Sequence, residues 1–118
     1  MYKFKHNNVE YTHSPYIPTI EGTNEDGSFI LGATLQKKLE LTDEQAEAYH
    51  QEGLKNIIRE ERNFRLAETD WSAGSDVPEV LKDKYKSYRQ ALRDITKDVT
   101  LEETDGLEIK GFTWPEKP

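Results

Sequence analysis

The first residues of the chain alternate between apolar and polar side chains on either side of an asparagine pair. Tyr2 and Phe4 share one face of the first arm, and Val9 and Tyr11 share one face of the second. A period of two is typical of β-strands, and asparagine tolerates positive φ. The stretch therefore predicts a tight β-hairpin that turns at Asn7–Asn8.

The alternation then weakens before a second β-like stretch begins. Residues 14–27 contain two prolines, two glycines and few apolar side chains, which predicts a loop or arm rather than a packed element. The sequence SFILGATL at 28–35 predicts a short strand in which Gly32 is the weak point. Residues 1–41 are therefore expected to be rich in β-structure.

From Thr42 onward the apolar positions follow the period of a helix, which is expected to run to about Glu68. TDEQ at 42–45 is a capping box, in which the Thr42 hydroxyl accepts from the Gln45 amide and the Gln45 side chain reaches back. The predicted apolar stripe consists of Ala46, Tyr49, Leu54, Ile57 and Phe64. Glu60 and Glu61 fall within or beside this stripe, so either the stripe is only half buried there or a cation from elsewhere in the chain faces these two acids.

A second helix is predicted over residues 79–95. Its apolar seam has a spacing of four, three, four and three residues and consists of Leu81, Tyr85, Tyr88, Leu92 and Ile95. Asp76 is expected to cap this helix, and Pro78 suits its first turn. A connection of about eight residues favours two antiparallel helices that share their seams.

The chain ends in a further alternating stretch, LEIKGFTW at 107–114, after a polar loop. The phase slips at Gly111, from Leu107 and Ile109 to Phe112 and Trp114, which predicts a strand with a bulge. The N-terminal hairpin is its candidate partner. The expected fold class is α+β, with a β-rich docking segment at 1–41 and a helical-hairpin domain at 42–118, unless the whole chain forms one compact domain.

The sequence RLAETDWSAGSDVP joins the two predicted helices and is interpreted as an elbow. Asp70 suits bonds to nearby backbone amides after a helix end. One interpretation makes Trp71 a buried anchor that folds back over the helix pair, because an indole buries a large area. The other leaves Trp71 partly exposed, as a residue that seats in a pocket of a partner.

Composition narrows the function. Hydrophobic residues make up 34% and charged residues 33%, so the core is thin, and a partner or a second copy is a means of completing it. A net charge of −7 argues against nucleic acid and against anionic lipid as partners. The chain has no cysteine, no apolar run near the roughly 20 residues of a membrane span and no leader-like start. These features predict a soluble intracellular protein.

The chemistry-bearing residues do not converge on a catalytic site. His6, His13 and His50 are scattered, and the sequence contains neither a nucleophile elbow nor a glycine-rich phosphate loop. The acidic turns are too short of ligands for a calcium loop. We therefore expect no enzyme activity, no cofactor, no metal and no small-molecule substrate.

The second helix is locally basic although the chain is acidic. Arg89 and Arg93 flank its seam, and further cations are Lys82, Lys84, Lys86 and Lys97. They predict a solvated face that pairs with Glu60, Glu61 or Asp70, or a face that binds protein. A nucleic-acid face is disfavoured, because the interleaved tyrosines lie on the seam.

Several of these pieces together resemble the phage tail assembly chaperone family. They occur in the family's order over about half of the chain: Arg62, Leu66, AETDW at 67–71, SDVP at 75–78, YRQALRD at 88–94 and WPEKP at 114–118. Arg65 replaces the first residue of a leucine pair, SAGS occupies the turn, and Tyr85 lies where the family often has a tryptophan. The first 40 residues have no counterpart.

The resemblance implies a non-enzymatic bacteriophage protein that binds tail or tail-fibre proteins in the host cytoplasm during assembly, with no cofactor. The organising residues are expected to be Asp70, Trp71, Tyr85, Tyr88, Arg89, Leu92, Arg93 and Trp114, with Asp70 and Arg89 as the polar tie between elbow and second helix. Two alternatives stay open: a permanent minor component of the virion tail or baseplate, bound through the N-terminal 40 residues, and a phage regulator of a host enzyme. A homo-oligomer also stays open.

Overall fold

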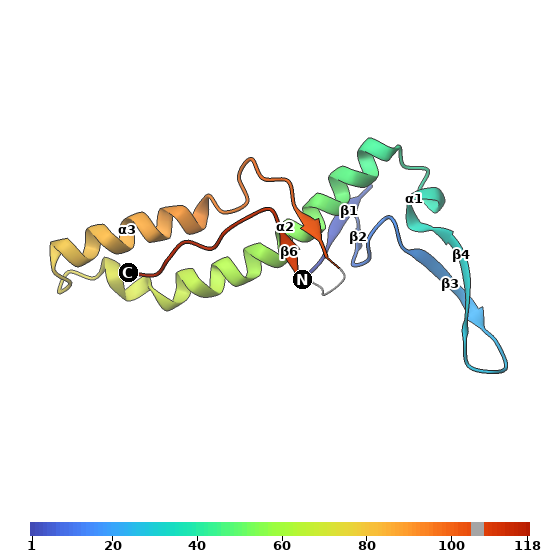
Figure 1. Ribbon diagram of the computed structural model, residues 1–118, viewed down its shortest axis with the longest axis horizontal. Coiled ribbons are helices and arrows are strands. Elements are labelled where there is room, and N and C mark those ends of the chain that lie inside the picture. The colour runs from blue at the N-terminus through green and yellow to red at the C-terminus, as the bar shows by residue number, and fades with distance from the viewer. Residues whose placement is uncertain (105–107) are drawn as a thin grey trace. The chain divides into compact units, whose positions relative to one another are not determined.

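The computed structural model describes residues 1–104 and 108–118 and has the expected α+β class. Its elements, drawn in Figure 1, are β1 (Phe4–His6), β2 (Val9–Tyr11), β3 (Pro18–Thr23), β4 (Phe29–Thr34), α1 (Leu35–Lys38), α2 (Asp43–Glu68), the 3₁₀-helix η1 (Asp70–Ala73), α3 (Glu79–Arg93), β5 (Glu102–Glu103) and β6 (Ile109–Lys110). The chain consists of two compact units, Met1–Leu54 and Lys55–Pro118, and the boundary between them falls within α2.

The N-terminal hairpin is confirmed. Strands β1 and β2 are antiparallel, with Phe4 opposite Tyr11 and His6 opposite Val9. Both turn asparagines have positive φ, 50° and 64°, as a tight two-residue turn requires. Phe4 is buried, and its ring stacks on Tyr49 of α2 at a centroid distance of 4.8 Å. This aromatic contact packs the hairpin against the helix.

The prediction that residues 14–27 form no packed element is wrong in one respect, because they contain strand β3. It pairs antiparallel with β4, and the register shifts twice between Pro18 and Gly22. A turn closes the pair, where the Asn24 amide donates to the Ser28 carbonyl at 2.7 Å and Gly27 adopts φ 89°. The predicted strand at 28–35 is present as β4.

Helix α2 begins at the predicted capping box. The Gln45 amide donates to the Thr42 hydroxyl at 3.1 Å, and the Thr42 amide donates to the Gln45 side chain at 2.9 Å. The predicted stripe is wrong in its second half, because Ile57 and Phe64 are exposed whereas Ile58 is buried. Leu54 and Ile58, four residues apart, are buried, and the half-buried Leu66 packs against the buried cluster of α3.

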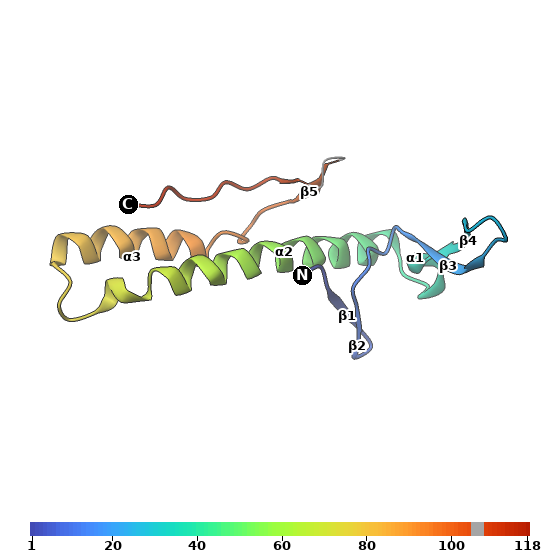
Figure 2. The same ribbon diagram turned by 90° about the horizontal axis from the view of Figure 1, so that it is seen from below.

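The core of the second unit lies between the end of α2 and α3, which run side by side and antiparallel in both views (Figures 1 and 2). The predicted seam is confirmed: Tyr85, Tyr88 and Leu92 are buried, and Leu66, Leu81 and Trp114 pack against them. Helix α3 ends at Arg93, earlier than predicted. Its N-cap is Pro78 with no side-chain cap bond, so the predicted cap at Asp76 is wrong.

The C-terminal strand does not pair with the hairpin. Instead β6 pairs antiparallel with β5, which lies in the predicted polar loop, with Glu103 opposite Ile109. The predicted break falls at Gly111, but φ of 106° makes it a bend that ends β6 rather than a bulge. A side chain there would also collide with the Thr100 carbonyl. Leu107, the first residue of the predicted strand, lies outside the described residues.

Candidate functional site

Within the elbow, only Thr69 separates the end of α2 from η1, and buried hydroxyl groups accept or donate hydrogen bonds at this helix end. The Thr69 hydroxyl donates to the Arg65 carbonyl at 3.1 Å, and the Ser72 hydroxyl donates to the Thr69 carbonyl at 2.7 Å. Both side chains are buried. Carbonyl groups that a helix end leaves without partners are thereby satisfied, and η1 is fixed in place.

Arg89 of α3 joins the two helices at the elbow. Its guanidinium donates to the Leu66 carbonyl at 2.6 Å, to the Thr69 hydroxyl at 2.8 Å and to the Asp70 carboxylate at 3.0 Å. The Arg89 side chain is 16% exposed, whereas that of Asp70 is 70% exposed. The predicted ion pair is therefore present, but the buried contacts with the end of α2 were not predicted from the sequence.

Trp71 is 52% exposed, so its interpretation as a buried anchor is wrong. Its ring meets Tyr85 edge to face, at a centroid distance of 4.9 Å. The seam beneath it is already filled, because Leu66, Leu81 and Trp114 cover the tyrosines. The chain therefore leaves about half of this indole at the surface.

Trp114 takes the anchoring place that was expected of Trp71. It lies in the C-terminal segment, is half-buried and packs against the cluster of Tyr85, Tyr88 and Leu92. The Arg65 guanidinium lies over its ring, 4.1 Å from the centroid, which is a cation–π contact. Arg65 also pairs with Glu61 at 3.1 Å, so the cation facing that acid comes from its own helix.

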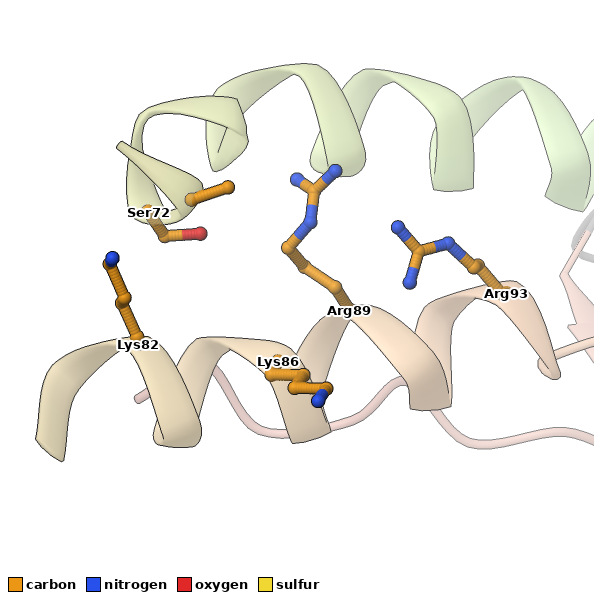
Figure 3. Close-up of a pocket in the computed structure, with 6 residues that line it drawn as sticks. Ser72, Lys82, Lys86, Arg89 and Arg93 are labelled. Carbon is orange, nitrogen blue, oxygen red and sulfur yellow. The ribbon is translucent and has the colours of Figure 1, made fainter. Parts of the chain in front are cut away.

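The structure divides the other predicted residues by environment. Tyr85, Tyr88 and Leu92 are core residues, whereas Arg93 is exposed. Arg93 lines a groove of about 380 Å³ beside η1 together with Ser72, Ala73, Lys82, Lys86 and Arg89 (Figure 3). The elbow thus presents a half-exposed indole and, from the same turn, one wall of a basic groove.

A polar cluster in the first unit was not anticipated. The Tyr2 and Ser14 hydroxyls lie 2.8 and 3.3 Å from the same nitrogen, Nδ1 of His50. The Tyr2 ring lies over Gly53, where a side chain would occupy the same space. Ser14 also accepts the Tyr16 amide. These contacts join the N-terminal segment to α2. In the sequence, the only sign of them is that His50 and Gly53 lie about one turn apart on the same predicted helix.

Tyr16 extends this cluster to an acid. Its hydroxyl donates to the Glu47 carboxylate at 2.7 Å. Partial burial and this bond raise the pKa of Tyr16 to about 12, and the bonds from Tyr16 and Gln51 lower the pKa of Glu47. Of the other histidines, His6 lies 2.9 Å from the Tyr49 hydroxyl and His13 is exposed.

Two kinds of site are absent from the described residues, 1–104 and 108–118. No group of histidine, aspartate and glutamate side chains there is arranged to hold a metal ion. No helix there combines the length and apolar character that crossing a membrane requires.

The fold places the chain in a class of small α+β proteins, in which a helical hairpin carries an exposed tryptophan and a basic groove at its elbow. Comparison with known families gives a match to the family described as phage tail assembly chaperone protein over residues 55–118. The chain therefore belongs to the phage tail assembly chaperone family. No curated protein and no solved structure matches it.

The family indicates a role in phage tail assembly, and chaperones of this kind are in general non-enzymatic. The matched residues coincide with the second compact unit, Lys55–Pro118, which contains the elbow, α3 and the C-terminal segment. The resemblance noted in the sequence is confirmed.

Proposed function

We propose that the chain binds tail or tail-fibre proteins in the host cytoplasm while the phage tail is assembled, and that the elbow is the contact surface. Family membership supports the setting. The observation that carries the proposal is that Trp71, which lies at the elbow within the family-matched residues 55–118, is 52% exposed. Tryptophan is enriched among the residues that dominate binding energy at protein interfaces.

The surroundings of Trp71 support this role because they hold the indole in place. Arg89 and the buried hydroxyls of Thr69 and Ser72 fix η1 from both sides. A side chain that is already ordered loses less conformational entropy when it binds. In this proposal Tyr85, Tyr88, Leu92 and Trp114 support the surface from beneath. Asp70 and Arg89 hold the elbow that carries the indole, and Arg93 lines the groove beside η1.

The test is capture of identified tail proteins from infected cells by tagged wild-type chain and by Trp71→Ala. Because about half of the indole is already in water, the substitution should lower the free energy of unfolding by only about 1–2 kcal/mol, below the 3–5 kcal/mol of a buried aromatic ring. The variant should therefore fold but lose the tail proteins. Phe64→Ala is the matched control, since Phe64 is 62% exposed on α2.

The control should retain the tail proteins. If Trp71→Ala is folded by circular dichroism and still captures them as well as wild type, the elbow is not the contact surface. If wild type captures a host enzyme and no tail protein, the regulator alternative replaces the proposal.

A second candidate, a permanent component of the virion tail, is favoured by the first unit. The β3–β4 sheet has only two strands, and such a sheet is marginal in water on its own. Its exposed apolar residues are Ile20, Phe29, Ile30 and Leu31. In this version residues 1–41 dock on a tail or baseplate ring and residues 42–118 carry the chaperone-like domain. Mass spectrometry of purified virions should detect the chain, whereas a transient chaperone is found only in lysates.

A further inference from the structure

Four of the five basic side chains of α3 follow one line along the helix. Lys82, Lys86, Arg89 and Arg93 are spaced by four, three and four residues, so they share one face beside the buried seam. Ser72 and Ala73 of η1 complete the lining of the groove, and none of the described residues that line it is acidic. Its volume of about 380 Å³ lies within the usual range for ligand sites, about 300–1,000 Å³.

These cations differ in how strongly the chain itself engages them. Arg89 is committed to the end of α2, and Lys82 lies 3.8 Å from Glu79, which is largely exposed. In the part of the chain that the structure describes, Lys86 and Arg93 form no salt bridge. Figure 3 shows Arg93 extending into the space between α3 and α2. The groove therefore retains positive charge for a ligand.

The charge of the whole chain limits what this ligand is. The net charge of −7 repels a long polyanion such as nucleic acid before it reaches the groove. A short acidic segment carries less charge, so this repulsion is smaller, while within a few ångströms the cations of the groove dominate. Exposed charges farther apart than a Debye length, about 8–10 Å at moderate salt, are largely screened.

We infer that the groove binds a short acidic stretch of the partner polypeptide, next to the pocket in which that partner receives Trp71. The inference rests on the proposed function and adds the chemistry of the partner. Both features come from one short element, since η1 contributes Trp71 to the surface and Ser72 and Ala73 to the groove wall. A partner segment with carboxylates beside an apolar pocket matches both.

The direct test uses the full chain and a fluorescein-labelled peptide of alternating glutamate and glycine, followed by fluorescence anisotropy at low salt. The wild-type chain should bind this peptide and not the matched glutamine–glycine peptide. The double variant Lys86→Glu, Arg93→Glu should weaken binding by about tenfold or more. The double variant Lys84→Glu, Lys97→Glu is the control matched in charge, because both lysines are exposed and neither lines the groove.

Several results would overturn the inference. An equal loss of binding in the Lys84→Glu, Lys97→Glu variant would mean that the peptide senses only general charge. Tighter binding of a single-stranded DNA oligonucleotide of the same charge, through the same lysine and arginine, would assign the groove to nucleic acid. Sedimentation in which wild type self-associates and the double variant does not would assign it to a second copy.

Capture from infected cells separates this inference from the proposed function. If the double variant keeps the tail proteins that Trp71→Ala loses, the groove inference fails and the elbow proposal stands. If the double variant loses them as well while remaining folded, both are supported. If wild type captures no tail protein, the proposed function fails whatever the peptide shows.

Discussion

Arg89 shows how one residue type suits one position. Its planar fork reaches a backbone carbonyl, a hydroxyl and a carboxylate at once, and its side chain is mostly buried. A lysine ammonium is a compact charge that cannot hold three acceptors in this geometry. The elbow therefore depends on a guanidinium and not simply on a positive charge.

Substituting Arg89 should cost more unfolding free energy than substituting its partner Asp70. Arg89→Lys should lower the free energy of unfolding by about 1–3 kcal/mol, because the Leu66 carbonyl and the Thr69 hydroxyl lose a donor. Asp70→Asn should cost less than about 1 kcal/mol, because the carboxylate is exposed and its pair is screened. Urea denaturation of both variants measures the difference. Equal costs would show that the ion pair, rather than the carbonyl contact, holds the elbow.

At the scale of elements, features that depend on neighbouring residues were predicted from the sequence better than features that depend on residues far apart in it. The asparagine turn, the capping box and the seam of α3 each depend on residues a few positions apart, and each is confirmed. The placement of Trp71 depends on Trp114, which reaches the same seam from the far end of the chain. A helical wheel or a residue-spacing rule describes only one segment, so it cannot show that Trp114 occupies the place expected for Trp71.

The short β-strands were predicted poorly for a related reason. Strand β5 has two residues, too few for a period to be recognised, and of the strand predicted at 107–114 only Ile109–Lys110 is present, as β6. Strand β3 was missed because prolines and glycines conceal its alternation. Helix α2 was found, but its buried face was predicted as one stripe although different elements cover its two halves.

The contact between the Tyr16 loop and α2 gives a pH prediction. Hydrogen bonds from Tyr16 and Gln51 lower the pKa of Glu47 from its ordinary 4.5. Stability from this carboxylate is therefore fully present above pH 4.5 and is lost as the pH falls through the lowered pKa. Urea midpoints measured across this range should fall less steeply in Glu47→Gln than in wild type.

Tyr16→Phe supplies the control for that experiment. It removes the hydroxyl donor and leaves the carboxylate, so its midpoints should also fall less steeply than those of wild type. An unchanged pH dependence in both variants would show that this bond does not contribute to stability.

At the scale of the molecule, the two compact units differ in what they share with known proteins. The family match covers the second unit only, and the first unit has no counterpart in it. Charge is uneven as well, because basic residues outnumber acidic ones in α3 while the whole chain carries −7. A localised positive surface on an acidic chain favours partners with a short acidic segment and disfavours general adhesion to polyanions.

The most direct measurement of the central claim is the solvent access of Trp71. The chain contains two tryptophans, so it is labelled with 5-hydroxytryptophan, which can be excited selectively beside the ordinary tryptophan of tail proteins, and Trp71→Phe identifies the part of the signal that comes from Trp71. We predict that acrylamide quenches Trp71 readily in the free chain and much less once purified tail proteins are bound. An indole that is shielded in the free chain, or one that stays equally accessible in the complex, would contradict the account.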